Sequence, residues 1–223
     1  MIFLDFEATS LASGSTPIEV AWCSHDLRRG WSALIKPCLG WTDWSVMAER
    51  LHGISQSRLD ADGLMADDVM RRLNADLAAA PPVKCVSDNP EFDRRWLARL
   101  ADGAAVGVAF SIEPIPLDGL LAGARIRAGL TLGDEVHPLA AKRMADDAGL
   151  IDHRALPDVI RHAFRHAAIM LAQVDLEAGE APGGTPMPRS ERALEMREIL
   201  LKRARKLMAE LGRDNTRKGG LNV

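Results

Sequence analysis

The chain has 223 residues, of which 47% are hydrophobic and 26% are charged, as expected for a soluble globular protein with one good-sized domain and an appendage. Its formal net charge of −3 excludes a protein that holds long duplex nucleic acid by bulk electrostatic attraction, although it allows a local basic patch. The cysteines are far apart, no basic leader opens the chain and no apolar stretch is long enough to cross a bilayer, so we expect a cytoplasmic protein with reduced thiols and no membrane partner.

The opening segment, residues 1–9, predicts a buried strand that ends in two carboxylates. The run is rich in Ile, Phe and Leu, and Asp5 and Glu7 are two positions apart. Alternate side chains of a strand point to the same face, so Asp5 and Glu7 should lie side by side with Phe6 on the opposite face. Two such carboxylates repel each other unless a cation lies between them. The triplet therefore indicates either a cation site or a strand that ends in an ordinary polar turn.

The next segments predict an antiparallel meander followed by helices. Strands are expected over residues 18–23 and 30–36, joined by short turns. Helices are expected over residues 45–51 and 66–80, the second because its apolar residues recur at helical spacing.

Strands and helices then alternate through the rest of the core. We expect a fourth strand over residues 83–86, a helix over 90–100 and a fifth strand within 103–116. Further helices are expected over residues 117–128, 138–148 and 152–177. This order predicts an α/β fold whose mixed five-stranded sheet, an antiparallel meander followed by parallel strands, has helices on both faces.

Composition divides the chain into a core domain over residues 1–178, a Gly/Pro-rich linker over 179–188 and a C-terminal helix with a basic tail over 189–223. The apolar stripe of the last helix either docks on the core or pairs with a second copy of the chain. Its basic end has the charge to bind a partner or nucleic acid.

Two further acidic patches fall at predicted helix starts. Asp93 lies one turn into the helix after the fourth strand, and Asp158 lies five residues after His153 in the first turn of the last core helix. Each patch is also explained as a simple helix start, in which Asp88 or Asn89 caps the helix and acidic side chains favour its positive end.

One chemistry accommodates all three patches. If Asp5, Glu7, Asp93 and Asp158 converge, their four negative charges balance two divalent cations. Hard oxygen ligands suit Mg²⁺ or Mn²⁺, and two such ions can stabilise an in-line phosphoryl displacement. His153, on a loop beside the site, could take the proton from the attacking water.

These motifs resemble those of the DEDD superfamily, the proofreading-type 3′–5′ exonucleases with a ribonuclease H-like fold. Asp5-Phe6-Glu7 matches the first motif, residues 89–93 (Asn-Pro-Glu-Phe-Asp) match the second, and residues 153–158 (His-Arg-Ala-Leu-Pro-Asp) match the third. The motifs occur in family order and cover residues 1 to about 177. The superfamily's other branch uses a tyrosine in place of this histidine. Because the chain has no tyrosine, only the histidine branch (DEDDh) fits.

The resemblance implies a metal-dependent 3′–5′ exonuclease that releases nucleoside 5′-monophosphates from the 3′ end of single-stranded or frayed DNA or RNA. Asp5, Glu7 and Asp158 would bind one Mg²⁺ or Mn²⁺ ion. Asp5 would also bind a second ion with Asp93, directly or through water, and His153 would be the general base. The residues implied near the terminal nucleotide are Ala8, Thr9, Leu11, His52, Ile54 and Asn89.

The chain departs from the family at the second motif. The family often has His-Asn there, whereas this chain has Ser87-Asp88-Asn89, so Asp88 either adds negative charge near the phosphate path or rivals Asp93 as a ligand. A second hypothesis is a catalytically weak ribonuclease H-like subunit that binds nucleic acid or a polymerase, with the C-terminal helix as one contact surface. A third is an unrelated α/β domain with coincidental acids.

Two smaller patterns also have alternatives. Asp158, His162 and His166 share a helix face at a spacing that can bind zinc, but no Glu follows the first histidine, so we favour surface histidines or weak phosphate contacts. Trp41 and Trp44 either stack on bases or pack beneath a turn, and we favour packing.

Overall fold

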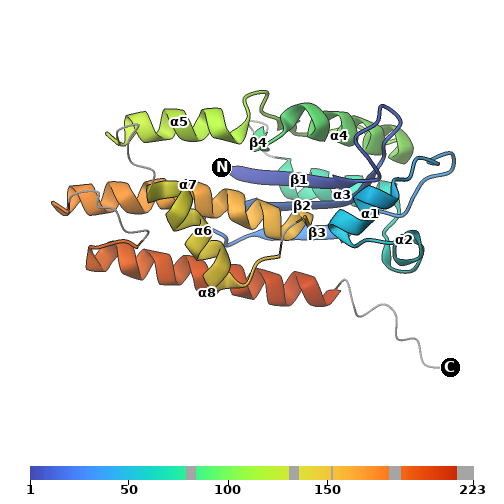
Figure 1. Cartoon of the computed structure of the whole chain (residues 1–223). Helices are drawn as coiled ribbons and strands as arrows, with labels where there is room; N and C mark the ends of the chain where they lie inside the picture. The colour runs from blue at the N-terminus through green and yellow to red at the C-terminus, as the bar shows by residue number, and fades with distance from the viewer. Residues whose placement is uncertain (79–83, 131–135, 152, 181–186, 215–223) are drawn as a thin grey trace.

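The computed structural model describes residues 1–78, 84–130, 136–151, 153–180 and 187–214, and these form a mixed sheet flanked by helices (Figure 1). The strands are β1 (Ile2–Ala8), β2 (Pro17–Ser24), β3 (Gly30–Leu34), β4 (Lys84–Val86) and β5 (Ser111–Ile112), in the order β3-β2-β1-β4-β5. β1 pairs with β2, and β2 with β3, in antiparallel register, whereas β4 pairs in parallel with both β1 and β5. The predicted α/β fold with a mixed five-stranded sheet is confirmed.

The described helices are α1 (Val46–His52), α2 (Gln56–Asp62), α3 (Ala66–Leu77), α4 (Pro90–Ala104), α5 (Leu117–Arg127), α6 (Val136–Ala148), α7 (Ala155–Glu177) and α8 (Glu191–Asp214). The sequence did not predict α2, because this short helix buries only Leu59 and so has no repeated apolar stripe. Its start is fixed locally, since the Ser55 side chain accepts a hydrogen bond from the backbone N–H of Arg58. None of the described helices is both long and apolar enough to span a membrane.

The two faces of β1 belong to two different cores. Phe3 packs in a cluster with Val159 and Phe164 of α7, whereas Leu4 and Phe6 pack in a second cluster with α3 and α4. Because side chains alternate along a strand, Asp5 and Glu7 share the face of Phe3 and point toward α7.

The parallel pairing of β1 stops before its carboxylates. β4 pairs only with Ile2 and Phe3, and the chain then leaves the sheet at Ser87 and enters α4 at Pro90. β1 therefore continues past the carboxyl end of β4. Asp5 and Glu7 lie on the part of β1 that pairs with β2 but not with β4. Crevices beyond the carboxyl ends of parallel strands are the usual place for ligands in α/β sheets.

The C-terminal helix packs on the core. Ala193, Leu201, Ala204 and Leu207 of α8 are buried in the cluster that contains the inner face of α7. In Figure 1, α8 runs beside α7 on the side away from α5. Its start is tied to the end of α7, since Asp175 accepts hydrogen bonds from the backbone of residues 189 and 190. Of the two predicted uses of the α8 stripe, the described residues show docking on the core; the basic tail lies outside them.

Candidate active site

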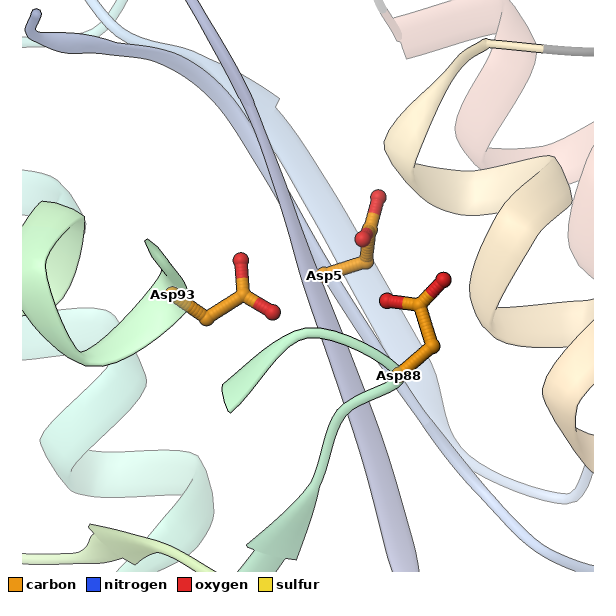
Figure 2. Close-up of side chains that lie close together, drawn as sticks. All are labelled: Asp5, Asp88 and Asp93. Carbon is orange, nitrogen blue, oxygen red and sulfur yellow. The ribbon is translucent and has the colours of Figure 1, made fainter. Parts of the chain in front are cut away.

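Two groups of three carboxylates meet at Asp5. One consists of Asp5, Glu7 and Asp158, and the other of Asp5, Asp88 and Asp93; within each group the ligand oxygens lie within 4.8 Å of one another. The close-up of the second group shows Asp93 and Asp88 on opposite sides of β1, with the Asp93 carboxylate pointing toward the strand and the Asp5 side chain on the same side as Asp88 (Figure 2). The structure thus brings together the four acids that the sequence singled out, and adds Asp88.

The first group joins β1 to the start of α7. Asp158 lies in the first turn of α7, where its Oδ2 accepts a hydrogen bond of 3.1 Å from the backbone N–H of Arg154. Its other oxygen, Oδ1, accepts one of 2.5 Å from Arg161 one turn later. The N-terminus of a helix stabilises negative charge, and both of these hydrogen-bond donors belong to the same segment as Asp158. The orientation of Asp158 is therefore set by its own segment.

The second group includes a buried oxygen without a partner. Asp93 is 1% exposed in the first turn of α4, and its Oδ2 accepts a hydrogen bond from the Ser87 hydroxyl. Among the described residues, its Oδ1 is buried and makes no hydrogen bond. An unpaired buried carboxylate oxygen is costly, so this atom indicates a place for a cation or another group that would satisfy it.

Crowding of the acids shifts their protonation. Burial, reinforced by the charge of Asp158, raises the pKa of Glu7 to about 8. Burial likewise raises the pKa of Asp93 to about 8, although the Ser87 hydroxyl opposes the shift. The pKa of Asp5 is raised well above its ordinary value by burial and by the surrounding carboxylates, and burial also raises the pKa of Asp158.

Asp88 differs from the other four acids. Its pKa is lowered, chiefly by the nearby ring of His162, and its side chain is 51% exposed. Without cations the enclosed acids retain protons near neutral pH, and divalent cations would displace those protons. The donor set is entirely carboxylate oxygen, which fits Mg²⁺ or Mn²⁺ better than zinc or copper.

A buried ion pair holds the loop before α7 against the sheet. Glu19 of β2 is 1% exposed and lies opposite Glu7 in the β1–β2 register. Its two carboxylate oxygens accept hydrogen bonds from Arg154 Nε (2.9 Å) and Nη2 (2.5 Å), and the backbone N–H of Ala155 donates a third (3.0 Å). Sequence reasoning missed Glu19, although a single acid inside an otherwise apolar strand was a usable signal.

His153 lies outside the two carboxylate groups. It is exposed on the loop between residue 152 and α7, and its φ of 56° is in the left-handed region. It is adjacent to Arg154, so the Glu19 pair fixes the backbone next to it. Burial lowers the pKa of His52, and the charges of the Glu19 pair also act on it.

A cavity of about 470 Å³ opens beside Glu7 between β1 and α1. Of the residues implied near a terminal nucleotide, Ala8, Leu11 and His52 line it, and Leu11 is 71% exposed. His52 Nδ1 accepts a hydrogen bond from the backbone N–H of Ile54, while Nε2 is buried with no partner in the described part of the chain. The volume and the mixed lining are typical of a small-molecule site.

Three of the implied contacts lie elsewhere. Ile54 is fully buried in a small core with Ile18, Leu34 and Leu59, so the expectation that it contacts a base is wrong for this structure. Its side chain packs against Leu59 of α2, a contact that no local pattern predicted. Thr9 is buried and donates to Asp43, which ties the loop after β1 to the segment before α1. Asn89 is exposed at the start of α4.

The smaller patterns are structural. The rings of His162 and His166 each pack against Phe3, and no metal-ligand group that includes them is found among the described side chains. His162 is buried, so the expectation of a surface histidine is wrong there. Trp41 packs against the core that contains α4, and Trp44 donates to Glu49 through Nε1 at 2.8 Å, as the packing interpretation predicted.

Comparison with known proteins adds no identification. No protein-family model matches the sequence, and a search of curated proteins finds no significant match. The function of this chain is therefore inferred from the arrangement of its own residues.

Proposed function

We propose that this chain is a metal-dependent 3′–5′ exonuclease of the histidine branch of the DEDD superfamily, with a ribonuclease H-like fold. The observation that carries the proposal is the pair of three-carboxylate groups that share Asp5. The sheet order, with an antiparallel meander followed by parallel strands and two acids on the first strand, is consistent with it. The three sequence motifs contribute one or two members each to the site.

In this proposal the carboxylates would hold two Mg²⁺ or Mn²⁺ ions, and Asp5 would belong to both sites. Glu7 and Asp158 complete one site and Asp93 completes the other. Bound there, the ions would neutralise charge that develops on the scissile phosphate and would make water a stronger nucleophile. Two ions also suit a cluster whose buried acids otherwise retain protons.

His153 is the proposed general base. It takes a proton from water as the water oxygen attacks the last phosphodiester phosphorus and the P–O3′ bond breaks. The leaving 3′ oxygen takes a proton from solvent water, so the shortened strand ends in a 3′-hydroxyl. The product is a nucleoside 5′-monophosphate. The exposed loop position of His153 lets it approach a substrate phosphate, while Arg154 anchors that loop.

The cavity beside Glu7 is the proposed seat of the terminal nucleoside. Leu11 offers an apolar face to a base, and His52 lines the same cavity. The backbone of Ala8 approaches this space from β1. The described contacts do not distinguish DNA from RNA, and we propose both as substrates.

The proposal predicts digestion from one end only. A 5′-labelled single-stranded oligonucleotide, incubated with the full chain and Mg²⁺, should give a ladder that shortens from the 3′ end, and EDTA should stop it. Asp5→Asn should lower the rate by at least about 10³-fold, because losing the shared ligand removes several kcal/mol of charge stabilisation. The exposed Asp102→Asn should keep the wild-type rate.

Two results would contradict the proposal. One is an oligonucleotide left intact at every Mg²⁺ and Mn²⁺ concentration, and the other is full activity in Asp5→Asn. Tight binding of the oligonucleotide without cleavage would instead favour a nucleic-acid-binding subunit.

A further inference from the structure

We propose that Asp88 is a fifth carboxylate of the metal centre, a direct ligand of the ion shared by Asp5 and Asp93, and that it allows this ion to bind before any nucleic acid. This inference deepens the proposed two-ion site and rests on it. It assigns a function to the residue at which the chain departs from the family motif.

The first observation is geometric. Ligand oxygens of Asp5, Asp88 and Asp93 lie within 4.8 Å of one another, a spacing that allows all three to reach one cation. Figure 2 shows the carboxylates of Asp93 and Asp88 approaching Asp5 from two sides. Asp88 stands on the turn between β4 and α4, so it reaches the site from the carboxyl end of the parallel strand next to β1.

The second observation is the unpaired oxygen of Asp93. This side chain is 1% exposed, the Ser87 hydroxyl occupies Oδ2, and Oδ1 has no hydrogen-bond partner among the described residues. In Figure 2 the Asp93 carboxylate points toward β1 and Asp5. A cation held by the three acids would satisfy this atom, and no described protein donor does so.

The third observation is an outer partner for Asp88. His162 is 5% exposed in α7, and its Nε2 lies 3.7 Å from Oδ2 of Asp88. The ring is fixed by edge contact with Phe3, at 6.3 Å between ring centroids. An outer group of this kind orients a ligand and is typical of metal sites. Because His162 contacts only Oδ2 of Asp88, the other oxygen, Oδ1, can turn toward Asp5 and Asp93.

The chemical consequence is a better-held second ion. With only Asp5 and Asp93 as protein ligands, that ion would depend on substrate phosphate oxygens, as Mg²⁺ commonly does. A third carboxylate raises both the ligand number and the negative charge around it. The two sites then each have three carboxylates, with Asp5 in common, and both should fill in the absence of nucleic acid.

The test is a Mn²⁺ titration of the full chain without nucleic acid, with free Mn²⁺ followed by electron paramagnetic resonance. The wild-type chain should bind two ions. Asp88→Asn should weaken one of them by at least about tenfold and leave the other unchanged. The matched control is Glu91→Gln, which removes an exposed charge three residues away that lies in neither carboxylate group. Circular dichroism melting checks that both variants fold.

The titration separates this inference from the nuclease. Identical two-ion curves for Asp88→Asn and wild type, or a wild-type chain that binds fewer than two Mn²⁺, would overturn the role of Asp88. Oligonucleotide digestion is measured on the same preparations. A wild-type chain that binds two Mn²⁺, loses one in Asp88→Asn and yet cuts nothing would support the role of Asp88 while contradicting the exonuclease.

Discussion

At the scale of single residues, three acids of the site each have a different neighbour that orients them. Ser87 holds Asp93, the backbone of Arg154 holds Asp158, and His162 approaches Asp88. Each of these contacts uses one oxygen of its carboxylate. The site is therefore preorganised by local hydrogen bonds, and cation binding would need little rearrangement of side chains.

His153 should be needed for the chemical step and not for metal binding. His153→Gln should lower kcat by roughly 10²- to 10⁴-fold, because the variant cannot take a proton from water. Mn²⁺ binding should be unchanged, since His153 lies outside both carboxylate groups. The measurements are steady-state digestion of a labelled oligonucleotide and the Mn²⁺ titration. The control is the exposed His25→Gln; equal rates for the two variants would remove His153 from the mechanism.

At the scale of elements, the start of α7 does most to build the site. It carries Asp158, follows His153 directly, and is clamped to β2 by the pair of Glu19 and Arg154. Glu19 is buried and the Arg154 side chain is only 17% exposed, so each depends on the other for its charge. Removing one partner leaves a buried charge unpaired, which is far more costly than losing a surface pair.

Glu19→Gln should therefore destabilise the chain by about 3 kcal/mol, measured by urea unfolding. It should also lower the digestion rate, because the loop that carries His153 loses its anchor. The matched control is Asp67→Asn, which breaks the exposed pair of Asp67 and Arg71 on α3 and should cost less than about 1 kcal/mol. Similar losses in the two variants would show that the Glu19 pair has no special role.

The docking of α8 is a second prediction at the element scale. Leu201 is 1% exposed in the cluster that also contains α7, whereas Ile199, two residues earlier, is 47% exposed. Leu201→Ala should cost about 2–4 kcal/mol of unfolding free energy, because a cavity is left in the core. Ile199→Ala should cost less than about 1 kcal/mol. A small effect at both positions would mean that α8 adds little to the stability of the core.

At the scale of the whole molecule, the acid cluster links stability to pH and to metal. The folded-state pKa values of Glu7 and Asp93 are about 8, raised from ordinary values of 4.5 and 3.8. A group whose pKa is raised by folding favours the folded state while it is protonated. Its contribution is complete below the ordinary pKa and is lost as the pH rises to the folded value. The metal-free chain should thus lose stability between about pH 4 and pH 8.

The corresponding measurement is Tm in EDTA at pH 5.5 and at pH 8. We expect Tm to be lower at pH 8 by at least about 4 °C, since a change of about 1 kcal/mol shifts Tm by roughly 2–4 °C in a chain of this size. Excess Mg²⁺ should reverse the loss, because it binds the folded state alone. Glu7→Gln should reduce the pH dependence; a dependence as steep as that of wild type would contradict the shifted pKa of Glu7.

Much of the fold and part of the candidate site could be read from the sequence. Apolar runs predicted the strands, helical spacing predicted the long helices, and the strand period put Asp5 and Glu7 on one face. These features depend on residues only a few positions apart, so a short segment is enough to predict them. The short helix α2 and the four extra residues of α4 were missed because local spacing says little about where a helix ends.

Only the tertiary structure decided which acids meet. Asp88 joins the Asp5 group because β4 stops pairing after Phe3 and turns the chain toward α7, and no local pattern encodes that turn. Glu19 faces Arg154 across 135 positions, and Ile54 is used for a small core rather than a surface. Contacts of this kind depend on how strands register and how helices cross the sheet. The sequence by itself determined the local elements and the chemical types of the ligands. Packing between segments far apart in the chain decided which acids come together around Asp5.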